Sequence, residues 1–138
     1  GWGGLSGADR PHPSTDLFTL DSIPHAWLFP RVAAVVHHGG AGTTGAGLRA
    51  GVPSVLVPHA GDQPLWARRV VELGVGPRPI ARRQLTAGRL AGAISSAVTD
   101  ASLRARAAAL GERIRAEDGL GRAIEIIEQP DQRPSDCV

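Results

Sequence analysis

The sequence predicts an α/β domain in which a parallel sheet is covered by helices on both faces. Two short apolar runs, at residues 33–36 and 54–57, have the composition of buried parallel strands. Each run is followed by apolar residues at helical spacing, and this alternation is typical of βαβ units with right-handed crossovers. At 138 residues the chain is long enough to bury a core without disulfides. We expect one domain over residues 1–128 and a disordered tail over 129–138.

Two elements are expected before the first buried strand. Residues 17–20 are short, apolar and β-compatible, which predicts a strand. Residues 24–29 predict a short helix that Ser22 caps and Pro30 ends.

Two helices are expected around the second buried strand. The spacing of small and apolar residues predicts a helix over 43–50, and Gly51 suits the position just past its end. A second helix is predicted over 62–73, because Pro64 is tolerated in a first turn and Gly74 suits a C-cap.

The last third of the chain predicts an edge strand followed by helices. The edge strand is expected at 77–80, and helices at 86–98 and 100–116 are each capped by their first residue. A final helix is expected at 119–128.

Composition excludes several classes of function. All fifteen basic residues are arginine, they are spread along the chain, and the formal net charge is only +2, so we expect no nucleic-acid partner. The single cysteine, Cys137, rules out a disulfide within the chain and a cysteine metal site, and makes a cytoplasmic setting the default. Apolar runs of at most five residues are too short to span a bilayer. The chain has no methionine and starts at glycine, so we expect a truncated N-terminal edge.

The segment 37–44, with the sequence HHGGAGTT, carries the clearest functional signal. Its glycines remove Cβ atoms that would keep an anion from the backbone, and Gly42, Thr43 and Thr44 fall where the first unpaired N–H groups of a helix point. The simpler interpretation is a tight turn without a ligand. The clustering of histidine, glycine and threonine after a buried strand favours a phosphate-binding turn.

Two pairs of polar residues accompany this turn. His37 and His38 point to opposite faces of an extended segment, so only one of them, His38 in our interpretation, is expected to face the anion. Asp62 and Gln63 follow the second strand, where a carboxylate beside an amide suits sugar hydroxyls. The alternative for Asp62 is a simple helix cap.

Four blocks in this order and spacing resemble the signature of the UDP-glycosyltransferase family, and most of all its sterol 3-beta-glucosyltransferases and bacterial antibiotic and macrolide glycosyltransferases. The resemblance extends over residues 1–98, and its blocks are PHAWLFP (24–30), HHGGAGTT (37–44), LRAGVP (48–53) and GDQP (61–64). It implies the GT-B fold, in which two Rossmann-like domains face each other across a cleft. This chain resembles part of the C-terminal, donor-binding domain.

The resemblance also implies the ligand contacts. The donor is UDP-glucose or a related nucleotide sugar, and neither a cofactor nor a metal is implied. His38, Gly40, Gly42, Thr43 and Thr44 correspond to the diphosphate site, Asp62 and Gln63 to the donor-sugar site, and Ser22 and Ile23 to residues facing the uracil.

The activity implied is transfer of a hexose, with glucose favoured, to a hydroxyl of a lipophilic acceptor such as a sterol or a polyketide aglycone. The general base belongs to an N-terminal domain that this sequence lacks, so we expect the isolated chain to be inactive. The acceptor implies peripheral contact with a membrane. The alternative is a nucleotide-sugar-binding module without catalysis.

Four positions leave the family pattern or have two interpretations. Ala46 stands where plant relatives have a ribose-binding glutamate, and Leu20 where they have a uracil-stacking tryptophan. Trp27 could replace that stacking surface, but an aromatic residue on a short helix is more often part of the core. His59 either lines the sugar pocket or ends a strand.

Overall fold

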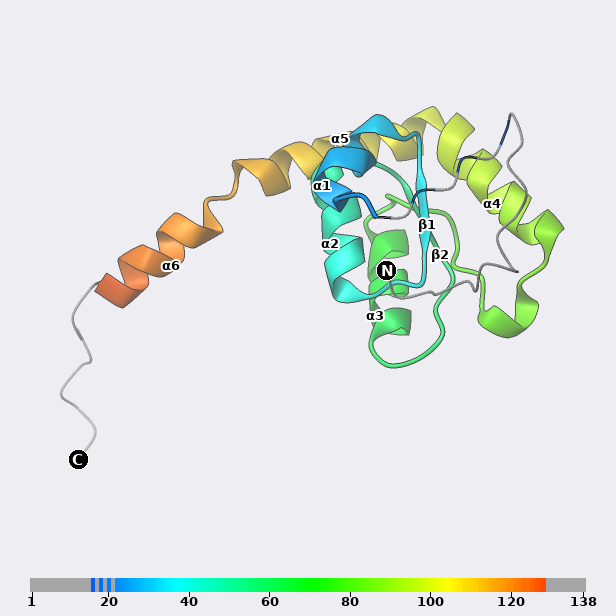
Figure 1. Cartoon of the computed structure of the whole chain (residues 1–138), viewed down its shortest axis with the longest axis horizontal. Helices are drawn as coiled ribbons and strands as arrows, with labels where there is room; N and C mark the ends of the chain where they lie inside the picture. Colours follow the sequence, from blue (N-terminus) through cyan, green and yellow to red (C-terminus); the bar gives the residue numbers. More distant parts are fainter. Residues whose placement is uncertain (1–15, 17, 19, 21, 129–138) are drawn as a thin grey trace.

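The computed structural model describes residues 16, 18, 20 and 22–128. Within these residues the chain forms two strands and six α-helices, and the predicted strand–helix–strand–helix order is found from β1 to α3 (Figure 1). In chain order the elements are α1 (His25–Leu28), a 3₁₀ turn (Phe29–Arg31), β1 (Val35–His37), α2 (Ala41–Ala50), β2 (Ser54–Leu56), α3 (Gln63–Glu72), a second 3₁₀ turn (Arg82–Gln84), α4 (Ala87–Thr99), α5 (Ala101–Ala116) and α6 (Gly119–Glu128).

The two strands form a parallel pair, as expected for a βαβ unit. Val35 lies opposite Ser54 and His37 opposite Leu56, and the pairing continues one step further, where the Val57 N–H donates to the His37 carbonyl (2.9 Å). Because parallel strands end at the same edge of a sheet, the segments that follow β1 and β2 emerge side by side.

Helices cover both faces of β2, which confirms the predicted layering. On one face Leu56, 1% exposed, packs with Val70 of α3 and Ala107 of α5. Val55 points to the other face and is fully buried on the side of α4. Figure 1 shows α1 and α2 on one side of the strands and α4 on the other.

A close backbone approach docks α2 against α5. Gly51 ends α2 with a φ of +74°, and its N–H donates to the Leu48 carbonyl. A Cβ on Gly111 of α5 would lie 2.5 Å from the Gly51 Cα, so only glycine at 111 permits this approach.

The predicted caps of three further helices are confirmed. Gly74 follows α3 with a φ of +66°. The Thr86 hydroxyl accepts from the Arg89 N–H at the start of α4, and the Asp100 carboxylate accepts from the Leu103 N–H at the start of α5.

The prediction for the first helix was wrong in its cap and its end. Pro24 occupies the N-cap position, and no side chain caps the helix, so Ser22 does not do so. Pro30 does not end the helical conformation, because it lies in the first positions of the following 3₁₀ turn. The N–H groups at these positions have no partner within the turn, so the missing N–H of proline costs no hydrogen bond.

The predicted edge strand at 77–80 is also wrong. The Ser54 N–H donates to the Val75 carbonyl, and the Ile80 N–H donates to the Leu56 carbonyl. Between these two bonds the segment advances from residue 75 to 80 while β2 advances only from 54 to 56, so the two do not pair residue by residue. Pro77 and Pro79 have a fixed φ and no N–H to donate, which prevents regular pairing.

The chain ends lie partly outside the described residues. Of the predicted strand at 17–20, Leu17 and Thr19 are not described, and Phe18 and Leu20 are not in a strand. Residues 129–138, predicted as a tail, are not described either. Figure 1 shows α6 extending away from the helices that surround the strands. None of the helices in the described ranges is both long and apolar enough to cross a membrane.

The contact between Gly51 and Gly111 gives a stability prediction. Gly111→Ala should lower the free energy of unfolding by about 1–3 kcal/mol, because the new methyl group overlaps rigid backbone. Gly92→Ala is the matched control in α4, where a Cβ meets nothing within 4 Å. It should stabilise the chain by about 0.5–1 kcal/mol. Urea unfolding of both variants measures the difference, and equal effects would refute the close-contact argument.

Candidate functional site

A tight turn connects β1 to α2 and forms the base of the site. The Gly39 N–H donates to Nδ1 of His37 (3.1 Å), so the imidazole closes the turn from inside. Gly39 has a φ of +93°, a backbone conformation that residues other than glycine rarely adopt. The His37 Nε2 atom is buried and has no hydrogen-bond partner among the described residues.

Helix α2 starts two residues earlier than predicted. Gly40 is extended (φ −62°, ψ 145°) and serves as the N-cap, and the first intrahelical bond runs from the Thr44 N–H to the Gly40 carbonyl (2.9 Å). The unpaired N–H groups at this end therefore belong to Ala41, Gly42 and Thr43. Thr44 was expected among them, but its N–H is bonded and its side chain is fully buried.

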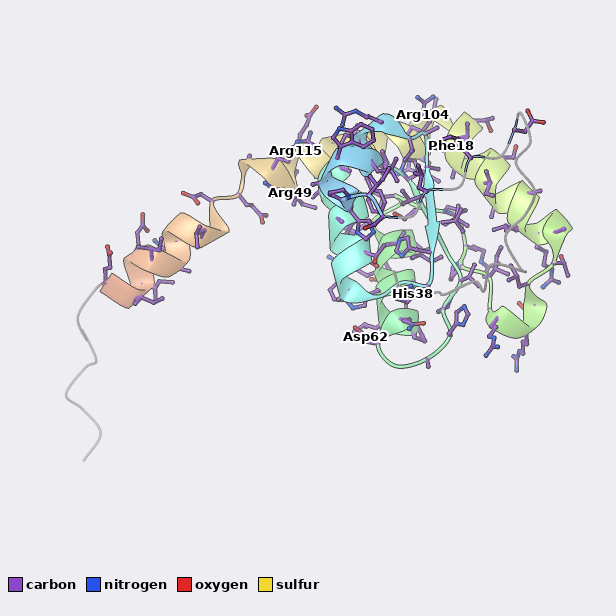
Figure 2. All side chains as sticks on the ribbon, viewed as in Figure 1. Phe18, His38, Arg49, Asp62, Arg104 and Arg115 are labelled. Carbon is purple, nitrogen blue, oxygen red and sulfur yellow. The ribbon has the colours of Figure 1, made fainter. Side chains whose placement is uncertain are left out.

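His38 lies over this helix end. Its Nε2 atom is 2.6 Å from the position that a Cβ on Gly40 would occupy, so glycine at 40 leaves the space in which the imidazole sits. Figure 2 shows His38 and Asp62 on the side where α2 begins, with Arg49 and Arg115 on the side where α2 ends.

An open pocket of about 870 Å³ lies against the turn and the start of α2. It brings together four of the predicted diphosphate residues and one predicted sugar residue, but not Thr44, Asp62, Ser22 or Ile23. Its lining residues are His25, His38, Gly40, Ala41, Gly42, Thr43, His59 and Gln63.

Gln63 reaches the pocket from the segment after β2. A Cβ on Gly39 would lie 3.3 Å from the Gln63 carbonyl oxygen, so the turn packs directly against this residue. The side-chain oxygen of Gln63 accepts from the N–H groups of His59 (2.7 Å) and Ala60 (3.1 Å). The amide is thereby oriented, and its NH₂ group remains available to donate.

Asp62 does not act as a side-chain cap, although it occupies the N-cap position of α3. Its Oδ2 atom instead accepts from the indole Nε1–H of Trp66, one helical turn on (2.9 Å). The simple capping interpretation is therefore wrong, and the carboxylate is exposed beside Gln63.

Comparison with known proteins identifies this arrangement. A family model for the C-terminal domain of erythromycin biosynthesis protein CIII-like proteins matches residues 10–126. The chain belongs to this family. The predicted resemblance to a C-terminal GT-B domain is confirmed.

Three relatives illustrate the breadth of the family. A sterol 3-beta-glucosyltransferase of Cryptococcus neoformans is 50% identical over 125 residues, which are 91% of this chain and 8% of that protein. The O-mycaminosyltylonolide 6-deoxyallosyltransferase of Streptomyces fradiae is 45% identical over 83% of this chain and 27% of its own. The crystal structure of glycosyltransferase VinC in complex with DTDP superposes with a TM-score of 0.69 at 30% identity, covering 79% of this chain and 28% of VinC. The chain thus spans less than a third of each of them.

The remaining sequence interpretations can now be placed on this glycosyltransferase domain. His59 lines the pocket. Trp27 is 53% exposed, with the Arg31 guanidinium 4.5 Å from its ring centroid, so its assignment to the core was wrong. Ser22 is exposed and Ile23 is half-buried, both outside the pocket wall.

Sequence reasoning missed His25, Ala41 and Trp66. Ala41 was missed because the start of α2 was placed too late. Trp66 carried a usable signal, since residues four apart on a helix lie side by side and its indole can only donate. His25 carried none, because its place in the pocket depends on how α1 packs beside α2.

His37 supplies a pH-dependent term in stability. Its pKa is lowered to about 4, mainly by burial and in addition by the neighbouring His38 and His25. The unfolded chain, with an ordinary histidine pKa of 6.5, therefore takes up a proton at higher pH than the folded chain does. Stability should fall as the pH drops through this window, from about 6.5 to about 4.

His37→Asn tests this prediction. Its side-chain oxygen can accept from the Gly39 N–H in place of Nδ1, but it does not titrate. The wild-type melting temperature should fall more steeply than that of the variant as the pH is lowered from 6.5 to 4. Parallel curves from thermal denaturation would show that His37 is not the titrating group.

Proposed function

We propose that the chain is the donor-binding part of a glycosyltransferase that moves a hexose, glucose first among the candidates, from a UDP-sugar to a hydroxyl of a lipophilic acceptor. The observation that carries the proposal is one pocket wall in which the free N–H groups of α2, the His38 imidazole and the Gln63 amide converge. These groups suit a diphosphate followed by a sugar.

The diphosphate fits the start of α2 for electrostatic reasons. Three unpaired N–H groups and the positive end of the helix dipole favour an anion, and no acidic side chain lines the pocket within the described residues. His38 adds a donor beside them. A leaving diphosphate gains negative charge as the glycosidic bond breaks, so these donors act more strongly on the transition state than on the ground state.

The proposed scheme uses no metal ion. Within the ranges that the structure describes, no three histidine, cysteine or acidic side chains are placed to hold an ion. Stabilisation of the leaving group falls to the backbone donors and His38 instead.

In a nucleotide sugar, the hexose and the nucleoside are attached to opposite ends of the diphosphate. Gln63 and Asp62 would bind sugar hydroxyls, since one donates and the other accepts. Ser22 and Ile23 remain our candidates for the uracil, in a part of the chain close to His25 of the pocket wall. VinC, which was solved with DTDP, supports a nucleoside diphosphate as the ligand class.

The acceptor class is inferred from relatives. A sterol glucosyltransferase and a 6-deoxyallosyltransferase acting on O-mycaminosyltylonolide both share this domain. The proposed acceptor is a hydroxyl on such a large apolar molecule, and contact with a membrane would follow from extracting it. The general base that deprotonates it is proposed to lie in a separate N-terminal domain, so the chain alone should not turn over.

Gly42→Ala tests the diphosphate assignment. A Cβ there meets nothing within 4 Å and enters the pocket, so affinity for UDP should fall about tenfold, or about 1.4 kcal/mol. Gly45→Ala is the matched control, because it lies in the same helix with equally free space and outside the pocket wall. Neither variant should be destabilised. Calorimetric titration with UDP decides, and equal affinities for both variants would contradict the assignment.

The full-length protein tests the activity. Calorimetry with UDP, UDP-glucose, TDP-glucose and GDP-mannose should give tightest binding for UDP-glucose, and incubation with UDP-glucose and a sterol or a macrolide aglycone should yield a glycoside. Binding of the nucleotide sugar without transfer of the hexose would support the alternative, a nucleotide-sugar-binding module without catalysis. A transfer reaction by the 138-residue chain alone would refute the proposed division of labour.

A further inference from the structure

Trp66 forms a side-chain hydrogen bond at the start of α3. Its Nε1–H donates to Oδ2 of Asp62 at 2.9 Å, across one turn at the start of α3. Asp62 is exposed and its carboxylate caps no backbone N–H, so within the described residues its hydrogen-bond donor is the indole of Trp66. The bond holds an exposed carboxylate in a single orientation.

The same segment orients Gln63 in a complementary way. Two backbone N–H groups, from His59 and Ala60, occupy the side-chain oxygen of Gln63. That side chain can offer only its NH₂ group to a ligand, while Asp62 offers its free Oδ1. Two adjacent residues therefore present an oriented donor, Gln63 in the pocket wall beside Gly39, and an oriented acceptor, Asp62 next to it in the chain.

We propose that Trp66 is a positioning residue for the donor sugar, acting through Asp62. The inference rests on the proposed function, in which Asp62 and Gln63 bind the hexose. A carboxylate that is already oriented loses less rotational freedom when a sugar hydroxyl binds, so the indole should improve affinity for the hexose without touching it.

A purely structural role for Trp66 makes a different prediction. If the indole only stabilised the start of α3, its loss would lower the melting temperature. It would also lower the affinities for UDP and for UDP-glucose to the same extent. A positioning role changes the ratio of the two affinities, because UDP lacks the hexose that Asp62 binds.

Trp66→Phe separates these roles, because it removes the N–H and keeps an aromatic ring. Calorimetry on the full-length protein should show UDP-glucose binding about tenfold more weakly, with UDP affinity within about twofold of wild type. Leu65→Ala is the control on the same helix, since Leu65 is 60% exposed and does not line the pocket. It should leave both affinities unchanged.

Asp62→Ala provides a second route that does not depend on the folding of the tryptophan variant. This variant should lower the affinity for UDP-glucose and leave the affinity for UDP unchanged. The double variant Trp66→Phe/Asp62→Ala should bind UDP-glucose no more weakly than Asp62→Ala alone. Additive losses, or equal losses for UDP and UDP-glucose, would overturn the positioning role. Equal affinities of the wild-type protein for UDP and UDP-glucose would also overturn it.

Failure of the proposed function gives a distinct result. In that case wild-type protein would bind neither UDP nor UDP-glucose, and both inferences would fall together. Normal binding of both ligands by wild type, with Trp66→Phe indistinguishable from it, would remove only the role of Trp66.

Discussion

The site depends on the conformation of one glycine in the turn after β1. Gly39 has a φ of +93°, and a Cβ there would lie 3.3 Å from the Gln63 carbonyl oxygen and 3.6 Å from Cδ2 of Leu56. Because the backbone can approach so closely, the start of α2 and the segment after β2 share one pocket. A larger residue would combine strained backbone with steric pressure on Gln63 and Leu56.

The electrostatic character of the pocket follows from this turn. The neutral His37 imidazole accepts the Gly39 N–H and keeps the turn closed, while the N–H groups of Ala41, Gly42 and Thr43 stay unpaired. A helix end of this kind favours an anion through partial charges that are in place before the ligand arrives. The fold thus places these partial charges in advance at the anion site that we propose.

Local chemistry explains which features were predictable from sequence. Gly51, Gly74 and the capping residues of α4 and α5 are signals that act within a few residues, and β1 and β2 lie in short, mostly apolar runs of sequence. The start of α2 was misplaced because an extended glycine and a helical glycine look alike in sequence. The segment 77–80 was misread because its pairing depends on how the chain returns to β2. Trp27 was misassigned because its ring lies under the Arg31 side chain rather than in the core.

The central claim is that the turn and the start of α2 bind a diphosphate. Titration of the ¹⁵N-labelled chain with UDP, followed by amide chemical shifts, tests it most directly. We predict the largest shifts at Ala41, Gly42 and Thr43, where unpaired N–H groups meet the ligand. Unchanged shifts at these three amides, with changes instead around Arg78 and Arg89 in the groove beside α4, would contradict the account.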